Sequence, residues 1–449
     1  MRQADTTIFA LSSGSVPAGV AVIRLSGSQS RFAIETFLKQ AYPSPRQSTL
    51  CNLYHPVDKS LLDQVILLSF PAPASFTGED VVEIHCHGSR AVVAILLDCL
   101  SQIPGVRAAE PGEFSRRAFE NGKLDLTAVE GLGDLIHADT EVQRRQAVVQ
   151  MAGGLEKIYS TWRADIVRMR ALIEADLDFA DEEDVPSDVT DGLFDEIRNL
   201  SAEINRHITQ GEIGERIRDG VRIALVGAPN VGKSSLLNAL AKRDVAIVTD
   251  QPGTTRDVIE VQLDLRGYPV SVFDTAGLRE TTDLVEQEGI RRSTVEAVRA
   301  DLVVALTDHK GTSVDDELAR LQTDAEIIKA QNKTDLIESA QKQKSDGSLL
   351  FSARTGEGLG DLIDELSERV ARLCGDGKSE SAVWTRQRHK SLLLEVRDAL
   401  DMALASTDLG VELVAEHLRQ AGDSLGKLVG VIDVDDLLDV IFREFCIGK

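Results

Sequence analysis

The chain has 449 residues, a hydrophobic content of 43% and a formal net charge of −24. This length allows two or three domains, each with its own core, and the composition excludes long disordered regions. No run of about 18 strongly apolar residues occurs, so the sequence predicts no membrane span. The five cysteines, at positions 51, 86, 99, 374 and 446, are scattered and odd in number, which predicts reduced thiols and a cytoplasmic location.

The acidic excess is distributed unevenly along the chain. Residues 1–123 contain 11 Lys and Arg and 11 Asp and Glu, so the rest of the chain carries the whole surplus. A strongly acidic surface disfavours nonspecific binding of nucleic acid. We therefore expect any RNA or anionic ligand to meet the amino-terminal part of the chain.

Residues 1–120 combine strand-like and helix-like patterns. Apolar runs at Gly19–Leu25 and Gln64–Phe70 predict strands, and Ala91–Ser101 predicts a helix, so we expect an α+β domain. The uncharged opening Thr6–Ile23 is interrupted by a Ser- and Gly-rich stretch, which favours two strands joined by a loop over a signal peptide.

His85, Cys86 and His87, with Cys99 further along, could suggest a zinc site. No second pair of ligands stands at finger-like spacing. The sequence therefore favours a strand end over a metal site at these positions.

Helical periodicity dominates residues 121–217 and returns over 375–449, with breaks in the first segment near Gly153 and Pro186. The segment between them, 218–374, alternates apolar runs, loops and helical patterns. This arrangement indicates an α/β unit inserted into a helical domain, because the ends of an α/β domain often lie close together. Periodicity alone leaves two separate helical domains as an alternative.

The segment Gly227–Ser234 reads GAPNVGKS, which fits the phosphate-loop pattern GxxxxGK[ST] between an apolar run and a helix start. Backbone N–H groups and the helix N-terminus hold phosphates in such a loop. Lys233 is then expected to reach the β- and γ-phosphates, and Ser234 to bind Mg²⁺. A lone motif could be a chance match, but four further elements argue against this.

These four elements have the order and spacing of a guanine-nucleotide site. Asp274–Gly277 (DTAG) places a carboxylate near Mg²⁺ and an N–H near the γ-phosphate. Asn332–Asp335 (NKTD) ends in a carboxylate that can accept both donors of the guanine edge, which adenine lacks. Ser352–Arg354 adds a wall of the base pocket, and Gly253–Asp257 offers a metal-binding threonine in a segment that can order on the γ-phosphate. The set predicts a GTPase.

Leu278 follows the DTAG element, where many such GTPases carry a glutamine that orients the attacking water. A leucine cannot orient water, so another group must do this or turnover must be very slow. Glu286 is our candidate for that role, although its spacing alone favours an ordinary solvated charge.

Further motifs lie outside the GTPase segment. They are Val22–Gly27 (VIRLSG), Ser75–Asp80 (SFTGED), Pro111–Ser115 (PGEFS), Asn121–Asp125 (NGKLD) and the terminal Cys446–Lys449 (CIGK). With them the chain resembles the MnmE (TrmE) family of tRNA-modifying GTPases over essentially its whole length. The resemblance implies a multidomain fold: an α+β N-terminal domain (1–120) that dimerises and binds a folate, a discontinuous α-helical domain (121–217 and 375–449) that ends in the CIGK motif, and an inserted α/β Ras-like P-loop GTPase domain (218–374).

The resemblance also implies ligands and the residues that hold them. GTP contacts are expected at Asn230, Val231, Gly232, Lys233, Ser234, Ser235, Thr249, Asp250, Gln251, Pro252, Gly253, Thr254, Thr255, Asp274, Thr275, Ala276, Gly277, Asn332, Lys333, Thr334, Asp335, Ser352, Ala353 and Arg354. The implied K⁺ ligands are Asn230, Thr249, Gln251 and Thr254, and the implied Mg²⁺ ligands are Ser234 and Thr255. 5-Formyltetrahydrofolate is implied at Arg24, Glu83, Lys123 and Lys449. Catalytic roles are implied for Glu286, as the water-orienting group, and for Cys446, which by its position alone could equally be inert.

The hypothesis from the sequence is a cytoplasmic, homodimeric GTPase that converts GTP to GDP and phosphate, depends on Mg²⁺ and is stimulated by K⁺. With an MnmG-type FAD- and NADH-dependent partner, in a heterotetramer, it would add a carboxymethylaminomethyl-type group at carbon 5 of the wobble uridine of certain tRNAs, using a one-carbon unit from a tetrahydrofolate derivative. The alternatives are a ribosome-assembly GTPase that acts as an RNA-binding nucleotide switch, and a scaffold that binds GTP without hydrolysing it.

Overall fold

The computed structural model describes most of the chain. The described residues are 6–178, 192–243, 245–247, 260–274, 298–310, 313–321, 323, 325–337, 347–375, 382–432, 438, 441–442, 445 and 448. The chain forms two compact units: unit 1 comprises residues 1–133, 151–167 and 422–449, and unit 2 comprises residues 134–150 and 168–421.

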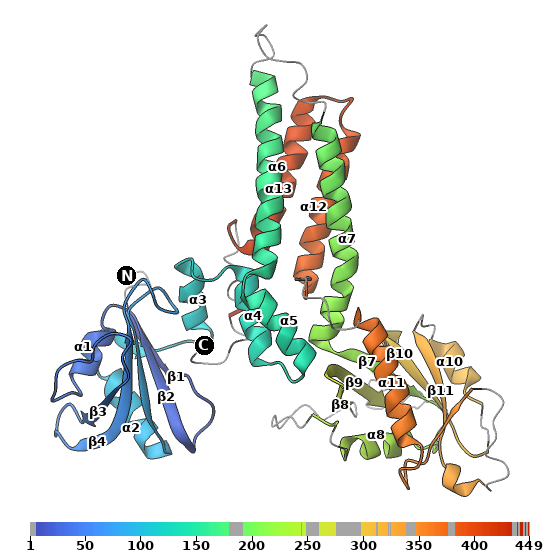
Figure 1. The fold of residues 1–449 in the computed structure, drawn as a ribbon, viewed down its shortest axis with the longest axis horizontal. Coiled ribbons are helices and arrows are strands. Elements are labelled where there is room, and N and C mark those ends of the chain that lie inside the picture. The colour runs from blue at the N-terminus through green and yellow to red at the C-terminus, as the bar shows by residue number, and fades with distance from the viewer. Residues whose placement is uncertain are drawn as a thin grey trace, which may run out of the picture. The chain divides into compact units, whose positions relative to one another are not determined.

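Helices and strands are labelled in Figure 1. The amino-terminal elements are β1 (Thr7–Leu11), β2 (Ala18–Ser26), α1 (Ser30–Glu35), β3 (Thr49–Tyr54), β4 (Leu61–Phe70), β5 (Val81–Gly88), α2 (Arg90–Ser101), β6 (Val106–Ala108) and α3 (Glu113–Glu120). The helices before the second sheet are α4 (Leu126–Ile136), α5 (Glu141–Met151), α6 (Gly154–Asp178) and α7 (Leu193–Asp219). The second sheet and its helices are β7 (Val221–Val226), α8 (Lys233–Ala241), β8 (Glu260–Leu265), β9 (Tyr268–Asp274), β10 (Leu302–Thr307), α10 (Asp315–Leu321), β11 (Glu326–Gln331), the 3₁₀ turn η2 (Thr334–Leu336), β12 (Leu349–Leu350) and α11 (Leu359–Leu373). The last helices are α12 (Gln387–Ala405) and α13 (Val411–Val429).

The amino-terminal sheet of unit 1 has the strand order β3-β4-β5-β2-β1-β6. Neighbouring strands are antiparallel except for β1 and β6, which are parallel. Alternate residues of each strand point to opposite faces, and Ala21, Ile23 and Leu25 of β2 are buried in a core that includes residues of α1 and α2. The residues between them, such as Arg24, lie on the other face. The expected α+β domain, including two strands within the uncharged opening, is confirmed.

The helical segments before and after the second sheet pack together within unit 2. Helix α7 lies beside α12 (Figure 1), and Trp384, just before α12, donates a hydrogen bond from Nε1 to the Ile208 carbonyl at 3.1 Å. Gly211 leaves the space that the Trp384 ring fills, because a Cβ there would lie 1.7 Å from Nε1. The helical domain is therefore discontinuous, and the alternative of two separate helical domains is wrong.

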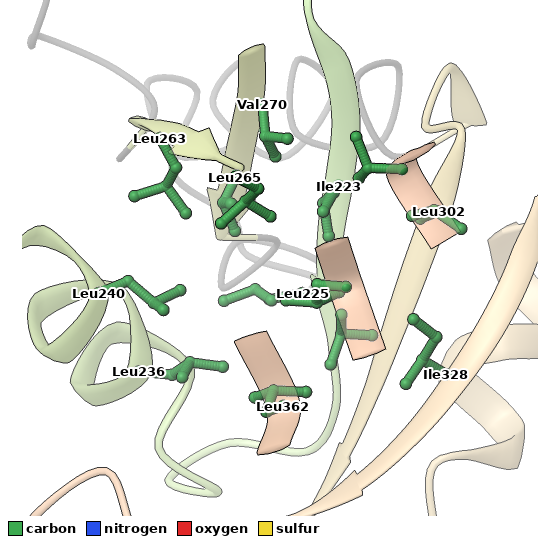
Figure 2. Close-up of a cluster of buried hydrophobic side chains, with 14 of the residues drawn as sticks. Ile223, Leu225, Leu236, Leu240, Leu263, Leu265, Val270, Leu302, Ile328 and Leu362 are labelled. Carbon is green, nitrogen blue, oxygen red and sulfur yellow. The ribbon is translucent and has the colours of Figure 1, made fainter. Parts of the chain in front are cut away.

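The sheet of the α/β part has the order β12-β11-β10-β7-β9-β8. All neighbouring strands are parallel except β8, which forms an antiparallel hairpin with β9 at the edge of the sheet. Figure 2 shows how Leu225 and Leu302 of the sheet meet Leu236 of α8 and Leu362 of α11 in one buried cluster. This packing fixes the carboxyl ends of β7, β9 and β11, where the loops of the candidate site begin. Among the described residues, no helix is both long enough and apolar enough to cross a membrane.

Candidate functional site

The phosphate loop joins buried strand β7 to the first turn of α8, and its backbone requires glycine at two positions. A Cβ at Gly227 would lie 2.3 Å from the Leu306 carbonyl oxygen, and one at Gly232 would lie 2.2 Å from Asn332 Nδ2. Gly232 has a φ of +103°, a region that side chains disfavour. The loop therefore lies tightly against the neighbouring strand ends and opens onto the N-terminus of α8, where backbone N–H groups can bind phosphate.

Lys233 and Asp274 are the buried charges of this site. Lys233 is 8% exposed and donates from Nζ to the carbonyl of Gly227 at 2.7 Å. The Ser234 hydroxyl donates to Asp274 Oδ2 at 2.7 Å, while Asp274 Oδ1 is buried and has no hydrogen-bond partner within the described part of the chain. A buried carboxylate oxygen without a partner is costly. A hydroxyl beside such a carboxylate is an oxygen set that fits Mg²⁺.

The base-binding segments meet at the end of β11. Asn332, which is 2% exposed, donates from Nδ2 to the Val231 carbonyl at 2.9 Å and accepts from Ala353 N at 3.0 Å. It therefore ties the phosphate loop to both walls of the base pocket. Ser352 donates from Oγ to Asp335 Oδ1 at 2.7 Å, which fixes that carboxylate and leaves Oδ2 for a ligand. Arg354 is a weaker contributor, because its side chain is 83% exposed and stands 3.9 Å from Asp335.

The structure thus brings the phosphate loop, the Asp274 carboxylate and the two base-binding segments to one edge of the sheet. The remaining predicted residues of the nucleotide site lie outside the described residues: Thr249, Asp250, Gln251, Pro252, Gly253, Thr254, Thr255, Thr275, Ala276, Gly277, Leu278 and Glu286. Cys446 and Lys449 also lie outside them. The roles given to all of these residues stay predictions.

A second polar cluster lies on the face of the amino-terminal sheet opposite α1 and α2. Arg24 of β2 and Glu83 of β5 are register partners, and Arg24 Nε donates to Glu83 Oε1 at 3.0 Å. The Arg24 guanidinium also lies over the Phe76 ring, 5.6 Å from its centroid. Lys123 lies beside the same loop, since a Cβ at Gly78 would be 3.3 Å from Lys123 Cε. Three of the four residues implied for folate are therefore grouped around the loop 75–80.

Sequence reasoning missed the ion pairs that hold this loop. Arg117 of α3, which is 5% exposed, donates from Nη1 to Glu79 Oε2 at 3.0 Å and from Nη2 to Glu113 Oε1 at 3.0 Å. Burial alone would raise the pKa of Glu113, but its hydrogen bonds with Arg107 and the Glu110 N–H, together with the charges of Arg107 and Arg117, lower that pKa below its ordinary value. The only sequence signal was the spacing of Glu113 and Arg117, one helical turn apart.

The His85-Cys-His87 stretch is part of strand β5, as the sequence favours. Its side chains alternate: the thiol of Cys86 is buried in the core, and burial raises its pKa to about 11. His87 Nδ1 lies 2.7 Å from Asp63 Oδ1 on the opposite face. Among the described residues, no group of three or more His, Cys, Asp or Glu is arranged to hold a metal ion.

The strand, phosphate loop and helix, with Asp274 and the Asn332–Asp335 and Ser352–Arg354 segments around them, define a P-loop GTPase of the guanine-nucleotide class. Comparison with known proteins identifies the family. The model of the "MnmE helical domain" matches residues 126–446, and that of the "GTP-binding protein TrmE N-terminus" matches residues 7–123.

Full-length relatives give the same result. The tRNA modification GTPase MnmE of Bradyrhizobium sp. (strain ORS 278) is 50% identical over 451 residues, covering 100% of this chain and 100% of that protein. The tRNA modification GTPase MnmE of Rhizobium meliloti (strain 1021) is 50% identical over 443 residues, covering 99% of each. The chain belongs to the MnmE family.

Proposed function

We propose that this chain is a GTPase of tRNA modification. With an MnmG-type FAD- and NADH-dependent partner, it adds a carboxymethylaminomethyl-type group at carbon 5 of the wobble uridine of certain tRNAs, with a one-carbon unit from a tetrahydrofolate derivative. One observation carries this proposal: the relatives named tRNA modification GTPase MnmE match the chain over its whole length, and not only over the GTPase sheet.

The GTPase step uses the residues gathered at the sheet edge. Lys233 neutralises charge on the β- and γ-phosphates, and Asp335 accepts hydrogen bonds from the donor edge of guanine. Ser234 and Thr255 would hold Mg²⁺, and Asp274 would hold it through a water. When bound, Mg²⁺ offsets negative charge on the phosphate oxygens. The unpartnered Asp274 oxygen supports this assignment. Glu286 orients the attacking water in place of a glutamine at position 278.

A monovalent ion is proposed to assist the same step. Its ligands are the side chain of Asn230 with Thr249, Gln251 and Thr254. K⁺, when bound there, supplies a positive charge against the charge that develops on the phosphates, which is the service an arginine finger gives in other GTPases. Turnover that is equal in Na⁺ and K⁺ at matched ionic strength would contradict this part of the proposal.

The folate is proposed to bind at the polar cluster of the amino-terminal sheet, through Arg24, Glu83, Lys123 and Lys449. A guanidinium has five N–H donors, so Arg24 keeps donors for a ligand while it is paired with Glu83. The aromatic ring of Phe76, 36% exposed and stacked on Arg24, offers a flat surface for a heterocycle. Cys446 is proposed as a residue required for the modification.

The protein is proposed to act as a cytoplasmic homodimer that joins its partner in a heterotetramer. Apolar side chains on the sheet face that carries Arg24 support a dimer contact: Val20 is 59% exposed, Leu50 62% and Ile66 42%. The proposed domains are the folate-binding and dimerisation domain (1–120), the helical domain (121–217 and 375–449) and the GTPase domain (218–374).

The test is mass spectrometry of tRNA nucleosides from cells that lack this chain, complemented with the wild-type gene or with Cys446→Ser. We expect the deletion to lose the carbon-5 aminomethyl uridines, and only the wild-type gene to restore them. An unchanged nucleoside profile in the deletion would overturn the tRNA-modifying function and favour the ribosome-assembly GTPase. Restoration by Cys446→Ser would remove only the role of the thiol.

A further inference from the structure

The carboxylate of Glu83 is held from two sides. Its Oε1 accepts from Arg24 Nε at 3.0 Å, and Arg24 Nη2 lies 2.9 Å from the same oxygen. On the other side, His85 Nε2 lies 3.2 Å from Glu83 Oε2. Glu83 and His85 are two residues apart on β5, so both side chains point to the same face of the sheet. Arg24 and Glu83 belong to the folate site proposed above, whereas His85 has no role in that proposal.

Within the described residues, the contacts of Glu83 leave one acceptor position on its carboxylate. An ionised carboxylate offers about four lone-pair sites and no donor. The two contacts of Arg24 occupy Oε1, and the ring of His85 occupies one site on Oε2. The remaining lone-pair site is on Oε2, the oxygen that His85 contacts. All three side chains are partly exposed: Arg24 by 20%, Glu83 by 17% and His85 by 29%. A ligand that donates to Glu83 from the open side of the sheet therefore meets the oxygen whose direction His85 sets.

A second anchor matters because the terminal torsion of a glutamate side chain is broad. Arg24 contacts a single oxygen, so it leaves the carboxylate plane free to turn about that contact. The bond to His85 fixes the other oxygen and with it the direction of the free lone pair.

His87 offers a comparison, because its carboxylate partner is not bonded to Arg24 within the described residues. It also lies on β5 with a carboxylate partner, Asp63, but its side chain is 70% exposed. Within the described residues, the Asp63 carboxylate accepts from His87 N and ring nitrogen and is not bonded to Arg24. Both histidines therefore lie on β5 and have a carboxylate partner. They differ because Glu83, the partner of His85, is also bonded to Arg24, whereas Asp63, the partner of His87, is not bonded to Arg24 within the described residues.

We propose that His85 is a positioning residue of the folate site: it acts through Glu83, by donating from Nε2 to Oε2, and orients that carboxylate toward a donor group on the heterocycle of the ligand. This inference rests on the folate binding proposed above and adds a residue and a role to it. His85 itself need not touch the ligand.

The test is isothermal titration calorimetry of 5-formyltetrahydrofolate into the full chain. We expect His85→Ala to weaken binding about tenfold, because an oriented hydrogen bond to a charged group is lost. His85→Gln, whose side-chain amide can still donate to Glu83, should stay within about threefold of wild type. His87→Ala is the matched control and should stay within about twofold. Thermal unfolding of each variant checks that the sheet is intact.

A double-mutant cycle separates positioning from a general effect on the fold. If His85 acts through Glu83, then His85→Ala should weaken binding by no more than about twofold in a Glu83→Ala background. A full tenfold loss in that background would overturn the proposal, as would wild-type affinity in the single His85→Ala variant. Absence of binding by the wild-type chain would overturn the folate proposal itself, and with it this inference, and is thus distinct from either result.

Discussion

The nucleotide site and the Arg117 network of the amino-terminal domain, which joins Arg117 to Glu79 and Glu113, both gather charged side chains, but within the described residues only the Arg117 network satisfies its charges by itself. Asp274 Oδ1 is buried without a partner in the described chain, whereas Glu113 and Glu79 both accept from Arg117. An incomplete set of contacts favours binding a ligand, while a complete set stabilises the fold. Substitutions should therefore act mainly on binding at the first site and mainly on stability at the second.

The largest effect should follow Lys233→Ala. Loss of the ammonium removes charge stabilisation at the transferred phosphate, so GTP turnover should fall about 10³-fold. The free energy of unfolding should change by less than about 1 kcal/mol, because the Lys233 ammonium donates to carbonyls of its own loop, Gly227 and Ala228. Turnover is measured by phosphate release and stability by urea unfolding. Lys242→Ala, at the exposed end of α8, is the control and should leave both unchanged.

If Lys233→Ala instead unfolds the protein, then the phosphate loop depends on its lysine for stability. A substitution at the nucleotide site would then act on stability, which contradicts the expected difference between the two regions. Retention of turnover would contradict the position of Lys233 at the phosphates.

The opposite behaviour is expected for Arg117→Met. Removing this guanidinium leaves the carboxylates of Glu79 and Glu113 without one of their partners, which should lower the free energy of unfolding by about 3 kcal/mol. GTP affinity should not change, because no residue of the nucleotide site is touched. Arg116→Met is the control: this neighbour pairs with Glu120 at the surface, so its loss should cost less than about 1 kcal/mol. Equal stabilities of the two variants would show that the Arg117 network does not stabilise the sheet.

Asp335→Asn should affect recognition and leave the fold intact. The variant loses an acceptor for the guanine edge, so GTP should bind roughly 100-fold more weakly. Xanthosine triphosphate should then bind better than GTP, because its carbonyl replaces the guanine amino group and can accept from the introduced amide. Fluorescent nucleotide titration measures both, with Asp361→Asn on the exposed start of α11 as control. Unaltered preference for GTP would remove Asp335 from the base pocket.

The two regions also differ in how far the sequence predicts them. Each described loop of the nucleotide site is a contiguous motif at the end of a strand, and parallel strands bring those ends together; the bond from Asn332 to Val231 is a consequence. The Arg117 network joins Thr6, Glu79 and Glu113, whose proximity depends on strand order and on the position of α3. Alternation along β5 places Glu83 and His85 next to each other on one face, but only the register of β2 with β5 places Arg24 opposite Glu83.

Acid should distinguish the regions by the pH at which each loses stability. Burial, together with the charge of the neighbouring His389, lowers the pKa of His207 on α7 in unit 2 from 6.5 to about 4. Between these values the unfolded chain binds a proton that the folded protein excludes, so stability falls as the pH falls. At pH 5 the loss relative to pH 8 should be about 2 kcal/mol. Glu113 in unit 1 has a lowered pKa, so its contribution is present above 4.5 and is lost only below that value.

Urea unfolding at pH 8, 6, 5 and 4 tests this order. His207→Gln removes the titrating group and should flatten the dependence above pH 5, whereas His417→Gln on α13 should leave it as in the wild type. An unchanged slope in His207→Gln would show that the buried histidine does not set this sensitivity, and a loss that begins only below pH 4.5 would place the first acid-sensitive contacts among the carboxylates of unit 1.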